Sequence, residues 1–462
     1  MTTSPVLATS TGDDLHLTDG SRVAVIGGGP AGSLFAYFLL EMAGRIDVKL
    51  GVDLYEPRSF SQPGPAGCNM CGGIVSETLV QNLAIEGVNL PSTVVQRGID
   101  SYVLHTDVGD VRIATPAQEV RIGALHRGAG PRDVKEARWE SFDRHLQQRA
   151  LARGAVAVSA RVERAGREPD GRPRIDTKDG RSQIYDLVVV ATGVNSPVLK
   201  VFEELGIGYE RPKVTKTIIR EYFLGRDAIA RTLGASMHVF LLDVPRLEFA
   251  AAIPKGDYVT VAVLGEEIDT ALVDAFLSTP EVRRCMPPGW DPDLKSCQCM
   301  PNIAVHGAPK PFADRYLFIG DAGVTRLYKD GLGAAYRTAK AAARAALFDG
   351  VSEEAFRRHF APVCRSIAND NAIGKLAFWV TRFARGFRPL RRGMLRMAAA
   401  EQGRPGRAQR MSGVLWDMFS GSAPYADIFL RMLRPAFLGR FLWSVAVSLW
   451  PGRRPALPEG TR

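Results

Sequence analysis

The stretch SRVAVIGGGPAGSLFAYFLL, residues 21–40, decides the fold of this chain. It begins with a short β-branched run, passes through a glycine-rich turn and continues as an apolar helix. Gly27, Gly29 and Gly32 have GxGxxG spacing. The first two glycines allow a tight turn and the close approach of a pyrophosphate, and the third lets helix and strand pack. The pattern predicts a dinucleotide-binding strand, turn and helix, with contacts from Gly27, Gly29, Pro30, Ala31 and Gly32.

An acidic residue ends the next predicted strand. The run VKLGVDLYEPRSF, residues 48–60, reaches Glu56 24 residues after Gly32. A carboxylate at this place accepts hydrogen bonds from a ribose 2′-hydroxyl, which favours a nucleotide without a 2′-phosphate. The alternative is a glycine turn with an incidental surface glutamate. We expect Glu56 and Arg58 to contact the cofactor.

Two later segments distinguish FAD from NAD. YDLVVVATGVNSPVL, residues 185–199, is a buried strand that runs into a small-residue turn, and residues 314–347 contain FIGDAG followed by a glycine-broken entry into an alanine-rich helix. An aspartate after a strand can bind the ribityl or pyrophosphate region, and a helix start offers amides to the polar edge of a flavin. The residues concerned are Ala191, Thr192, Gly193, Gly320, Asp321, Gly331 and Gly333.

Together these motifs resemble the FAD-dependent oxidoreductases of the para-hydroxybenzoate hydroxylase fold group, over about residues 20–350. Within that group the chain is most similar to the geranylgeranyl reductase family. CGG at 71–73 matches that family's Cys-Gly turn beside the flavin, and FAAAIPKGDYVTVAVLG at 249–265 matches its aromatic-rich strand followed by Pro-Lys. The resemblance implies FAD as cofactor, with Cys71, Gly72, Gly73 and Arg138 added to the cofactor-binding residues.

The chain departs from that family in the same strand. Family members usually carry Tyr and Trp there, whereas this chain has Phe249, Ala251 and Ile253. The tryptophan-rich strand of a flavin halogenase is also absent, so halogenation is not expected. Alanine in place of an aromatic residue widens the pocket and favours a bulky or flat substrate.

The expected fold class is α/β, and α+β overall. A Rossmann-like FAD-binding domain (20–95, 131–205 and 311–350) is interleaved with an antiparallel-sheet substrate domain (96–130 and 206–310), because segments of helix and strand alternation are separated by stretches of period-two alternation. Residues 351–462 form a basic helical C-terminal region. No second GxGxxG unit follows a strand, so NAD(P)H or a protein electron donor is expected to dock transiently.

Two closely spaced pairs of cysteines are expected to meet near the flavin, first as unmetallated thiols and second as metal ligands. Cys68 and Cys71 lie three apart, and Cys297 and Cys299 lie two apart. Two such pairs can supply four thiolates to a zinc ion or an iron–sulfur cluster. The alternatives are unmetallated thiols beside the flavin, a dithiol/disulfide couple, or packing. His105, His126 and His306 are expected to be structural or surface residues, since no partner motif surrounds them.

Reduction of an alkene requires a proton donor. Hydride leaves N5 of reduced flavin for one carbon of the double bond, and the other carbon needs a proton. The candidates are Cys71, Tyr328, and a water held by Lys329 and Asp330. A solvated turn is the alternative for the Lys-Asp pair.

The net positive charge lies in the C-terminal part of the chain, which we call the tail. The net charge is +10, but residues 371–462 contain sixteen Lys or Arg and four Asp or Glu, which leaves residues 1–370 near neutral. Basic residues alternate there with aromatic and aliphatic ones, and the longest apolar run, 441–450, is about half of the roughly twenty residues needed to span a bilayer. The pattern predicts peripheral docking on an anionic membrane, with a helical cap on the FAD domain as the alternative. No nucleic-acid fold accompanies the charge.

The sequence predicts an enzyme: an FAD-dependent oxidoreductase that reduces carbon–carbon double bonds of a hydrophobic prenyl or lipid substrate at the membrane surface. The first twenty residues lack a secretory pattern, so a cytoplasmic location is expected. The second hypothesis is an electron-transfer flavoprotein that passes electrons to a quinone through a cysteine-bound cluster. A flavin monooxygenase is third, and a non-catalytic flavin-bearing adaptor is the fourth.

Overall fold

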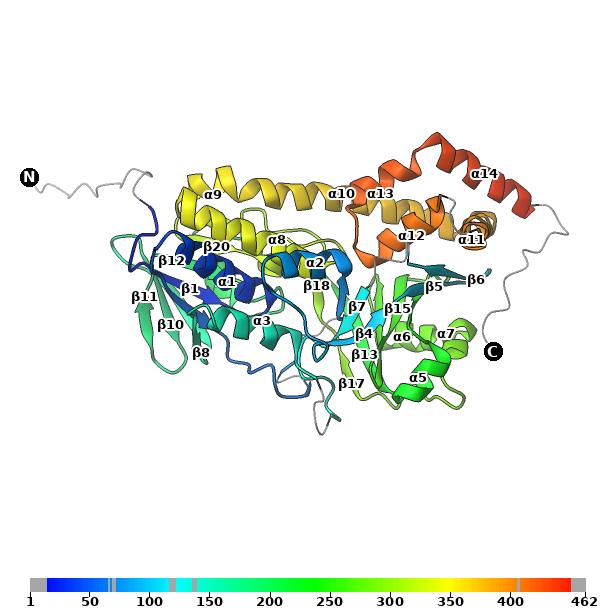
Figure 1. Cartoon of the computed structure of the whole chain (residues 1–462), viewed down its shortest axis with the longest axis horizontal. Coiled ribbons are helices and arrows are strands. Elements are labelled where there is room, and N and C mark those ends of the chain that lie inside the picture. Colours follow the sequence, from blue (N-terminus) through cyan, green and yellow to red (C-terminus); the bar gives the residue numbers. More distant parts are fainter. Residues whose placement is uncertain are drawn as a thin grey trace, which may run out of the picture.

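The computed structural model describes residues 15–64, 67–68, 72–115, 122–134, 139–404 and 408–449. The glycine-rich stretch forms the centre of a six-stranded, mostly parallel sheet (Figure 1). Only the edge pair β19–β20 is antiparallel. In spatial order the strands are β19 (Phe312–Ala313), β20 (Tyr316–Phe318), β12 (Leu187–Val190), β1 (Arg22–Ile26), β2 (Gly51–Tyr55) and β8 (Val156–Val158).

Alternation along β1 assigns the two faces of this sheet. Val23 and Val25 belong to the core under α1 (Pro30–Arg45), α3 (Phe142–Leu151) and α8 (Gly331–Arg344). Ala24 and Ile26 belong to the opposite core. Both faces are therefore buried, as a parallel sheet requires. The opposite face is covered by α4 (Leu199–Glu203) and by a small sheet of β9 (Val162–Arg167), β10 (Pro173–Thr177) and β11 (Ser182–Ile184).

A second, mainly antiparallel sheet lies beside the first (Figure 1). Its β14 pairs in parallel with β5, while its other pairs are antiparallel. Its strands, in spatial order, are β17 (Cys297–Cys299), β13 (Val214–Phe223), β16 (Tyr258–Gly265), β15 (Leu247–Lys255), β14 (Ser236–Phe240), β5 (Ser101–Thr106) and β6 (Gly109–Ala114), and β18 (Asn302–Ala304) pairs with β13. One face is covered by α5 (Arg226–Thr232), α6 (Thr270–Leu277) and α7 (Pro280–Cys285).

A three-stranded sheet joins the two larger ones. β3 (Ile74–Ser76) follows the loop after β2 and pairs with β7 (Ile122–Leu125), which in turn pairs with β4 (Val95–Ile99). Between β3 and β4, helix α2 (Glu77–Ile85) is capped by the Ser76 hydroxyl, which accepts a hydrogen bond from the amide of Leu79. The chain thus leaves the parallel sheet after β2, re-enters it at β8 and β12, and returns at β19 and β20. The expected α/β fold class is confirmed.

The basic tail is a set of helices that lies along one side of the molecule (Figure 1). Its first apolar residues, among them Phe356, Phe360 and Ile367, belong to the core under α1 and α8. Those from Ala377 onward belong to the core on the other face of the antiparallel sheet, where Trp416 stacks on Tyr102 with ring centroids 4.6 Å apart. The tail therefore packs on the antiparallel sheet as well as on α8. The helices are α9 (Glu353–His359), α10 (Ala361–Arg385), α11 (Arg388–Gln402), α12 (Arg410–Ser420), α13 (Tyr425–Met432) and α14 (Pro435–Leu449).

Ion pairs reinforce this packing. Arg391, which is buried, lies 2.9 Å from a carboxylate oxygen of Asp107, and Arg382 pairs with Glu248 and Glu266. Part of the tail's positive charge is thus used to hold the tail against the body. Among the residues described here, none of the helices combines the length and apolarity needed to cross a bilayer.

Candidate functional site

A cavity of about 600 Å³ extends from the first glycine turn to the antiparallel sheet. This volume is in the range of small-molecule sites. One end is lined by the turn after β1 and by Glu56 and Arg58, and the other by apolar side chains of β13, β15 and β16. The parallel sheet, with its glycine turn and charged residues, and the antiparallel sheet, with its apolar side chains, therefore meet at this cavity.

Only glycine fits at two positions of the glycine turn, Gly27 and Gly32, because a side chain there would clash with the backbone. A Cβ atom on Gly27, whose φ is +107°, would lie 2.6 Å from the carbonyl oxygen of Ala191. A Cβ atom on Gly32 would lie 1.9 Å from the carbonyl oxygen of Gly27. Helix α1 begins at Pro30 and has no side-chain cap. Its first amides are thus left for an anionic group at the cavity.

Glu56 stands at the end of β2 with only 6% of its surface exposed. One carboxylate oxygen accepts a hydrogen bond from the amide of Gly28 at 3.0 Å, and the other accepts from Nε of Arg58 at 3.0 Å. The carboxylate thereby ties the glycine turn to the second strand. It also lines the cavity, where it can accept further hydrogen bonds.

The structure brings most of the predicted cofactor residues to the cavity wall. Gly32 and Gly333 do not line it and act through packing and helix capping instead. Cys71 and Arg138 lie outside the described residues. The predicted residues that line the cavity are Gly27, Gly29, Pro30, Ala31, Glu56, Arg58, Gly72, Gly73, Ala191, Thr192, Gly193, Gly320, Asp321, Tyr328, Lys329, Asp330 and Gly331.

Asp330 caps the helix that enters the cavity wall. It has a left-handed φ of +54°, and its Oδ1 accepts a hydrogen bond from the amide of Gly333 at 3.2 Å. Its other oxygen lies 2.9 Å from Arg326. Burial raises the pKa of Asp330, while the positive charge of Arg326 acts in the opposite direction. This predicted catalytic residue is therefore a helix cap in a buried ion pair.

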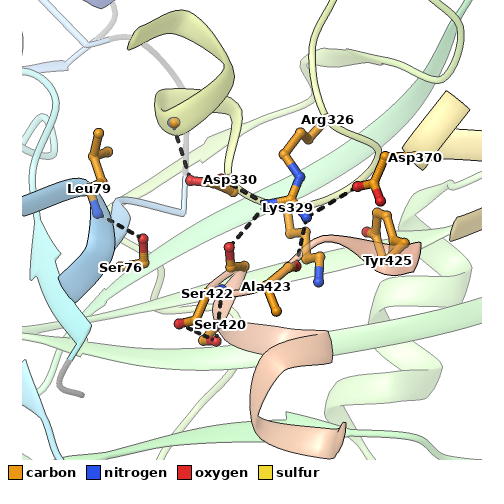
Figure 2. A network of polar contacts seen from close by, with 12 residues as sticks. Ser76, Leu79, Arg326, Lys329, Asp330, Asp370, Ser420, Ser422, Ala423 and Tyr425 are labelled. Atoms are coloured by element: carbon orange, nitrogen blue, oxygen red, sulfur yellow. Dashed lines mark hydrogen bonds and ion pairs between the residues drawn. The ribbon is translucent and has the colours of Figure 1, made fainter. Parts of the chain in front are cut away.

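The side chain of Lys329 points into a buried network of polar residues that includes Asp330 and Arg326 (Figure 2). Its ammonium donates to the carbonyl oxygen of Asp417 at 2.7 Å and lies 4.1 Å from the centre of the Tyr425 ring. Burial, together with the charge of Arg326, lowers the pKa of Lys329 to about 7. The Lys-Asp pair thus lies in a buried network rather than in a solvated turn.

Arg326 is the centre of that network (Figure 2). Besides Asp330, it lies 3.4 Å from Asp370 and donates to the carbonyl oxygens of Gly421 and Ala423 at 3.0 and 2.8 Å. These partners come from α10 and from the loop between α12 and α13. The network therefore joins the start of α8 to the C-terminal helices.

Tyr328 lines the cavity among aromatic rings, near the end formed by the antiparallel sheet. Its ring meets those of Phe249 and Phe378 edge-on, with centroids 6.3 and 5.1 Å away. Phe249 also contacts Phe419. Burial raises the pKa of Tyr328, so its phenol stays protonated at neutral pH. Of the predicted catalytic residues in the described chain, Tyr328 is the one whose side chain is not bound into the Arg326 network.

The predicted four-cysteine site is not formed by the described residues. Cys297 and Cys299 both lie on the edge strand β17. Within the parts of the chain that the structure describes, no group of three potential ligands includes them or Cys68. Burial raises the pKa of Cys297, as expected for a thiol in a protein wall.

Two contributors to the cavity were missed by the sequence analysis. Arg127 lines the cavity and forms a bidentate pair with the fully buried Asp143, at 2.9 and 2.8 Å. Phe419 reaches the cavity from α12. Neither residue belongs to a local motif, because each arrives through packing of segments far apart in the chain.

Comparison with solved structures identifies the fold. The chain is similar to a flavoprotein/dehydrogenase from Cytophaga hutchinsonii (TM-score 0.58, 14% identity, 93% of this chain and 100% of that one). It is also similar to the flavin-dependent brominase Bmp2 (TM-score 0.55, 13% identity, 92% and 93%). A third similar structure is PqsL, a probable FAD-dependent monooxygenase from Pseudomonas aeruginosa (TM-score 0.51, 15% identity, 79% and 98%).

These likenesses show the fold of FAD-dependent oxidoreductases, which confirms that part of the sequence prediction. The narrower resemblance to geranylgeranyl reductases gains no support from them. No protein-family model and no curated protein matches the chain.

Proposed function

We propose that this protein binds FAD and is a monooxygenase-type oxidoreductase, which inserts one oxygen atom of O₂ into a hydrophobic substrate at the expense of NAD(P)H. The observation that carries the proposal is the cavity of about 600 Å³, which runs continuously from the glycine turn after β1 to an apolar wall. The PqsL and Bmp2 structures, named as an FAD-dependent monooxygenase and a flavin-dependent brominase, support an oxygen-using reaction over double-bond reduction.

The residues present fit FAD. The turn at Gly27 leaves no room for a side chain and so lets a pyrophosphate approach the backbone. In the proposed complex Glu56 accepts hydrogen bonds from the ribose, Asp321 accepts from the ribityl chain, and the amides at Gly331 face the polar edge of the flavin ring. When bound, FAD supplies hydride acceptance from NAD(P)H and the activation of O₂.

The chain's own residues shape the substrate end. Phe249 and Phe419 exclude water from this end of the cavity, and Ala251 leaves space for a flat or bulky molecule. The protonated phenol of Tyr328 donates a hydrogen bond to a polar group of the substrate. No dedicated nicotinamide domain is needed if NAD(P)H visits the cavity and leaves after hydride transfer.

Oxygen use separates this proposal from double-bond reduction. The full chain, loaded with FAD, is incubated with NADPH and a solvent extract of hydrophobic metabolites under ¹⁸O₂, and products are identified by mass spectrometry. The proposal predicts a product with one labelled oxygen atom. A product that has gained two hydrogen atoms and no oxygen, formed equally well without O₂, would overturn it in favour of reduction.

We propose further that the hydrophobic substrate is taken from an anionic lipid surface. Trp379 and Phe383 on α10 are 63% and 57% exposed, one helical turn apart, and their rings stack with centroids 6.3 Å apart. Trp443 on α14 is 70% exposed. Arg382 and Arg385 lie in the last turn of α10, and Arg440 lies one turn before Trp443 on α14, a combination of basic and aromatic residues suited to the headgroup zone.

Vesicle flotation tests the lipid proposal. The full chain should float with vesicles of phosphatidylcholine and phosphatidylglycerol at low salt, and the Trp379→Ser, Phe383→Ser double variant should remain in the dense fraction. Phe223→Ser is the matched control, because Phe223 is 59% exposed on β13, away from the tail. Equal flotation of the wild type and the double variant contradicts docking through α10.

A further inference from the structure

Two histidines and a cysteine converge on one point away from the cavity. His105 lies on β5, His238 on β14 and Cys285 at the end of α7. All three are buried, and one potential ligand atom from each lies within 4.8 Å of the other two. No other such group of three occurs in the part of the chain that the structure describes.

The sheet register produces this arrangement. His105 stands opposite Asp110 on β6 and opposite Phe240 on β14, and His238 lies two residues before Phe240. Since side chains two apart on a strand share a face, Asp110, His105 and His238 form a row on one face of the sheet. Cys285 approaches from α7, which packs on that face.

The outer ring nitrogen of His238 fixes its tautomer. Nε2 of His238 lies 3.3 Å from the carbonyl oxygen of Leu233. That oxygen only accepts hydrogen bonds, so Nε2 carries the hydrogen, and in the neutral ring the inner nitrogen, Nδ1 of His238, presents a lone pair. In His105 the outer Nδ1 lies 3.1 Å from a carboxylate oxygen of Asp110 without a hydrogen bond, and the inner nitrogen is Nε2.

These two inner nitrogens are 2.9 Å apart. The lone pair on Nδ1 of His238 therefore faces Nε2 of His105, and the two nitrogens can share a proton or bind one metal ion. The sulfur of Cys285 lies 3.5 Å from Nε2 of His105 and so adds a third donor atom. In the metal-free site the thiol donates to the carbonyl oxygen of Glu281 at 3.2 Å, a hydrogen bond that a metal–sulfur bond would replace.

We propose that His105, His238 and Cys285 bind a zinc ion. Imidazole nitrogen and cysteine thiolate are both ligands that zinc takes in proteins, and three protein ligands leave a fourth position open. The Leu233 carbonyl, which accepts from the outer nitrogen of His238, and Asp110, 3.1 Å from that of His105, stand where second-shell partners orient zinc-bound histidines. Asp110 is partly exposed, with 38% of its side chain accessible, and gives the site a route to solvent.

The geometry needs only a small adjustment. Zinc–nitrogen bonds of about 2.0–2.1 Å at a tetrahedral angle place the two nitrogens about 3.3–3.4 Å apart, so the rings must separate by about 0.4–0.5 Å. On binding, the Cys285 thiol loses its proton to solvent and its sulfur becomes the third ligand, while a water completes the fourth position. No oxidant or reductant is involved.

Protonation states agree with this geometry. Burial, followed by the negative charge of Asp110, raises the pKa of Cys285 to about 12, and burial together with His105 lowers the pKa of His238 to about 3. The metal-free site therefore holds a neutral thiol and a neutral imidazole. A divalent ion would supply the positive charge that the buried thiolate needs.

The position of the site suggests a structural role. Met237, next to His238 on β14, belongs to the core on the opposite face and lines the cavity. A zinc ion joining β5, β14 and α7 would thus hold the strand that forms the back of the substrate wall.

Metal content and X-ray absorption test the proposal on the full chain. Protein expressed with added Zn²⁺ should retain one zinc ion per chain after desalting, and its zinc-edge spectrum should require one sulfur scatterer together with nitrogen scatterers. Removing zinc with a chelator should lower the thermal unfolding midpoint, and returning Zn²⁺ should restore it. This readout needs no variant to fold and is independent of flavin content.

Variants of the proposed ligands test which residues bind the zinc ion. Cys285→Ser and His238→Gln should each reduce bound zinc at least tenfold, whereas Cys364→Ser, which alters a buried cysteine on α10, should not. The double variant Cys297→Ser, Cys299→Ser should also keep its zinc. Zinc that stays in the Cys285 and His238 variants, or is lost with Cys297 and Cys299, overturns the assignment. Protein that takes up no Zn²⁺ and shows no shift in its unfolding midpoint also overturns the assignment. The contact between the two histidines is then explained by a shared proton.

Discussion

Replacing Arg326 by methionine should destabilise the protein strongly, because this residue is the positive centre of a buried network. Its side chain is 6% exposed and lies 2.9 Å from Asp330 and 3.4 Å from Asp370, whose side chains are 13% and 12% exposed. Methionine fills much of the space but leaves both carboxylates without their cation. Removing one partner from a buried ion pair costs about 3–5 kcal/mol, and the carbonyl oxygens of Gly421 and Ala423 also lose their donor.

Urea unfolding followed by far-ultraviolet circular dichroism measures this effect. The free energy of unfolding of Arg326→Met should fall by about 3–5 kcal/mol, and adding Asp370→Asn should recover part of the loss, since one unpaired charge is then removed. Arg337→Met is the control: Arg337 is an exposed arginine on α8, and its loss should change stability by less than about 0.5 kcal/mol. A loss below about 1 kcal/mol for Arg326→Met, or an equal loss in the control, refutes the argument.

Three further predictions concern the glycine turn, the lysine and the tail. Gly32→Ala should yield protein without bound flavin, because its Cβ atom would lie 1.9 Å from a backbone oxygen, whereas Gly44→Ala on the same helix meets no atom within 4 Å and should keep the flavin spectrum. For Lys329, the folded pKa of about 7 lies below the ordinary value of 10.5, so the unfolded chain binds the extra proton and stability should rise between those pH values. Urea unfolding should show this rise, about 2–3 kcal/mol from pH 7 to about pH 9, in the wild type and not in Lys329→Met. Trp416→Ala should lower the free energy of unfolding by about 3–5 kcal/mol, since the ring is almost fully buried; a change under about 1 kcal/mol would contradict the packing of α12 on the sheet.

The network around Arg326 connects the tail with the proposed cofactor site. Asp330 caps the helix whose first amides line the cavity, and Arg326 holds Asp330 and the loop between α12 and α13 together. Displacement of the tail would therefore disturb the start of α8. This contact gives a physical reason why the C-terminal helices matter for a site built mainly by other segments.

Local patterns in the sequence were sufficient for the dinucleotide half of the molecule. The spacing of Gly27, Gly29 and Gly32 requires a turn that no side chain fits, and alternating apolar residues determine which way each strand faces. Glu56 could be identified because it follows a strand at a set distance from that turn. These features depend on residues that are close together in the chain, so they can be predicted from the sequence.

Other features were decided only by tertiary structure. The basic tail was predicted as helical, but its ion pairs with acids of the antiparallel sheet could not be read from the alternation of arginine with aromatic residues. For the Lys-Asp pair the sequence left open a water-holding site or a solvated turn, and only the packing of α10, α12 and α13 places it in a buried network. His105 had no local partner motif, yet its partners His238 and Cys285 stand 133 and 180 residues further along the chain. Local sequence determines backbone conformation and the periodicity of burial. Contacts between distant segments arise only when whole layers pack. The proposed substrate wall and the proposed zinc site both depend on those contacts.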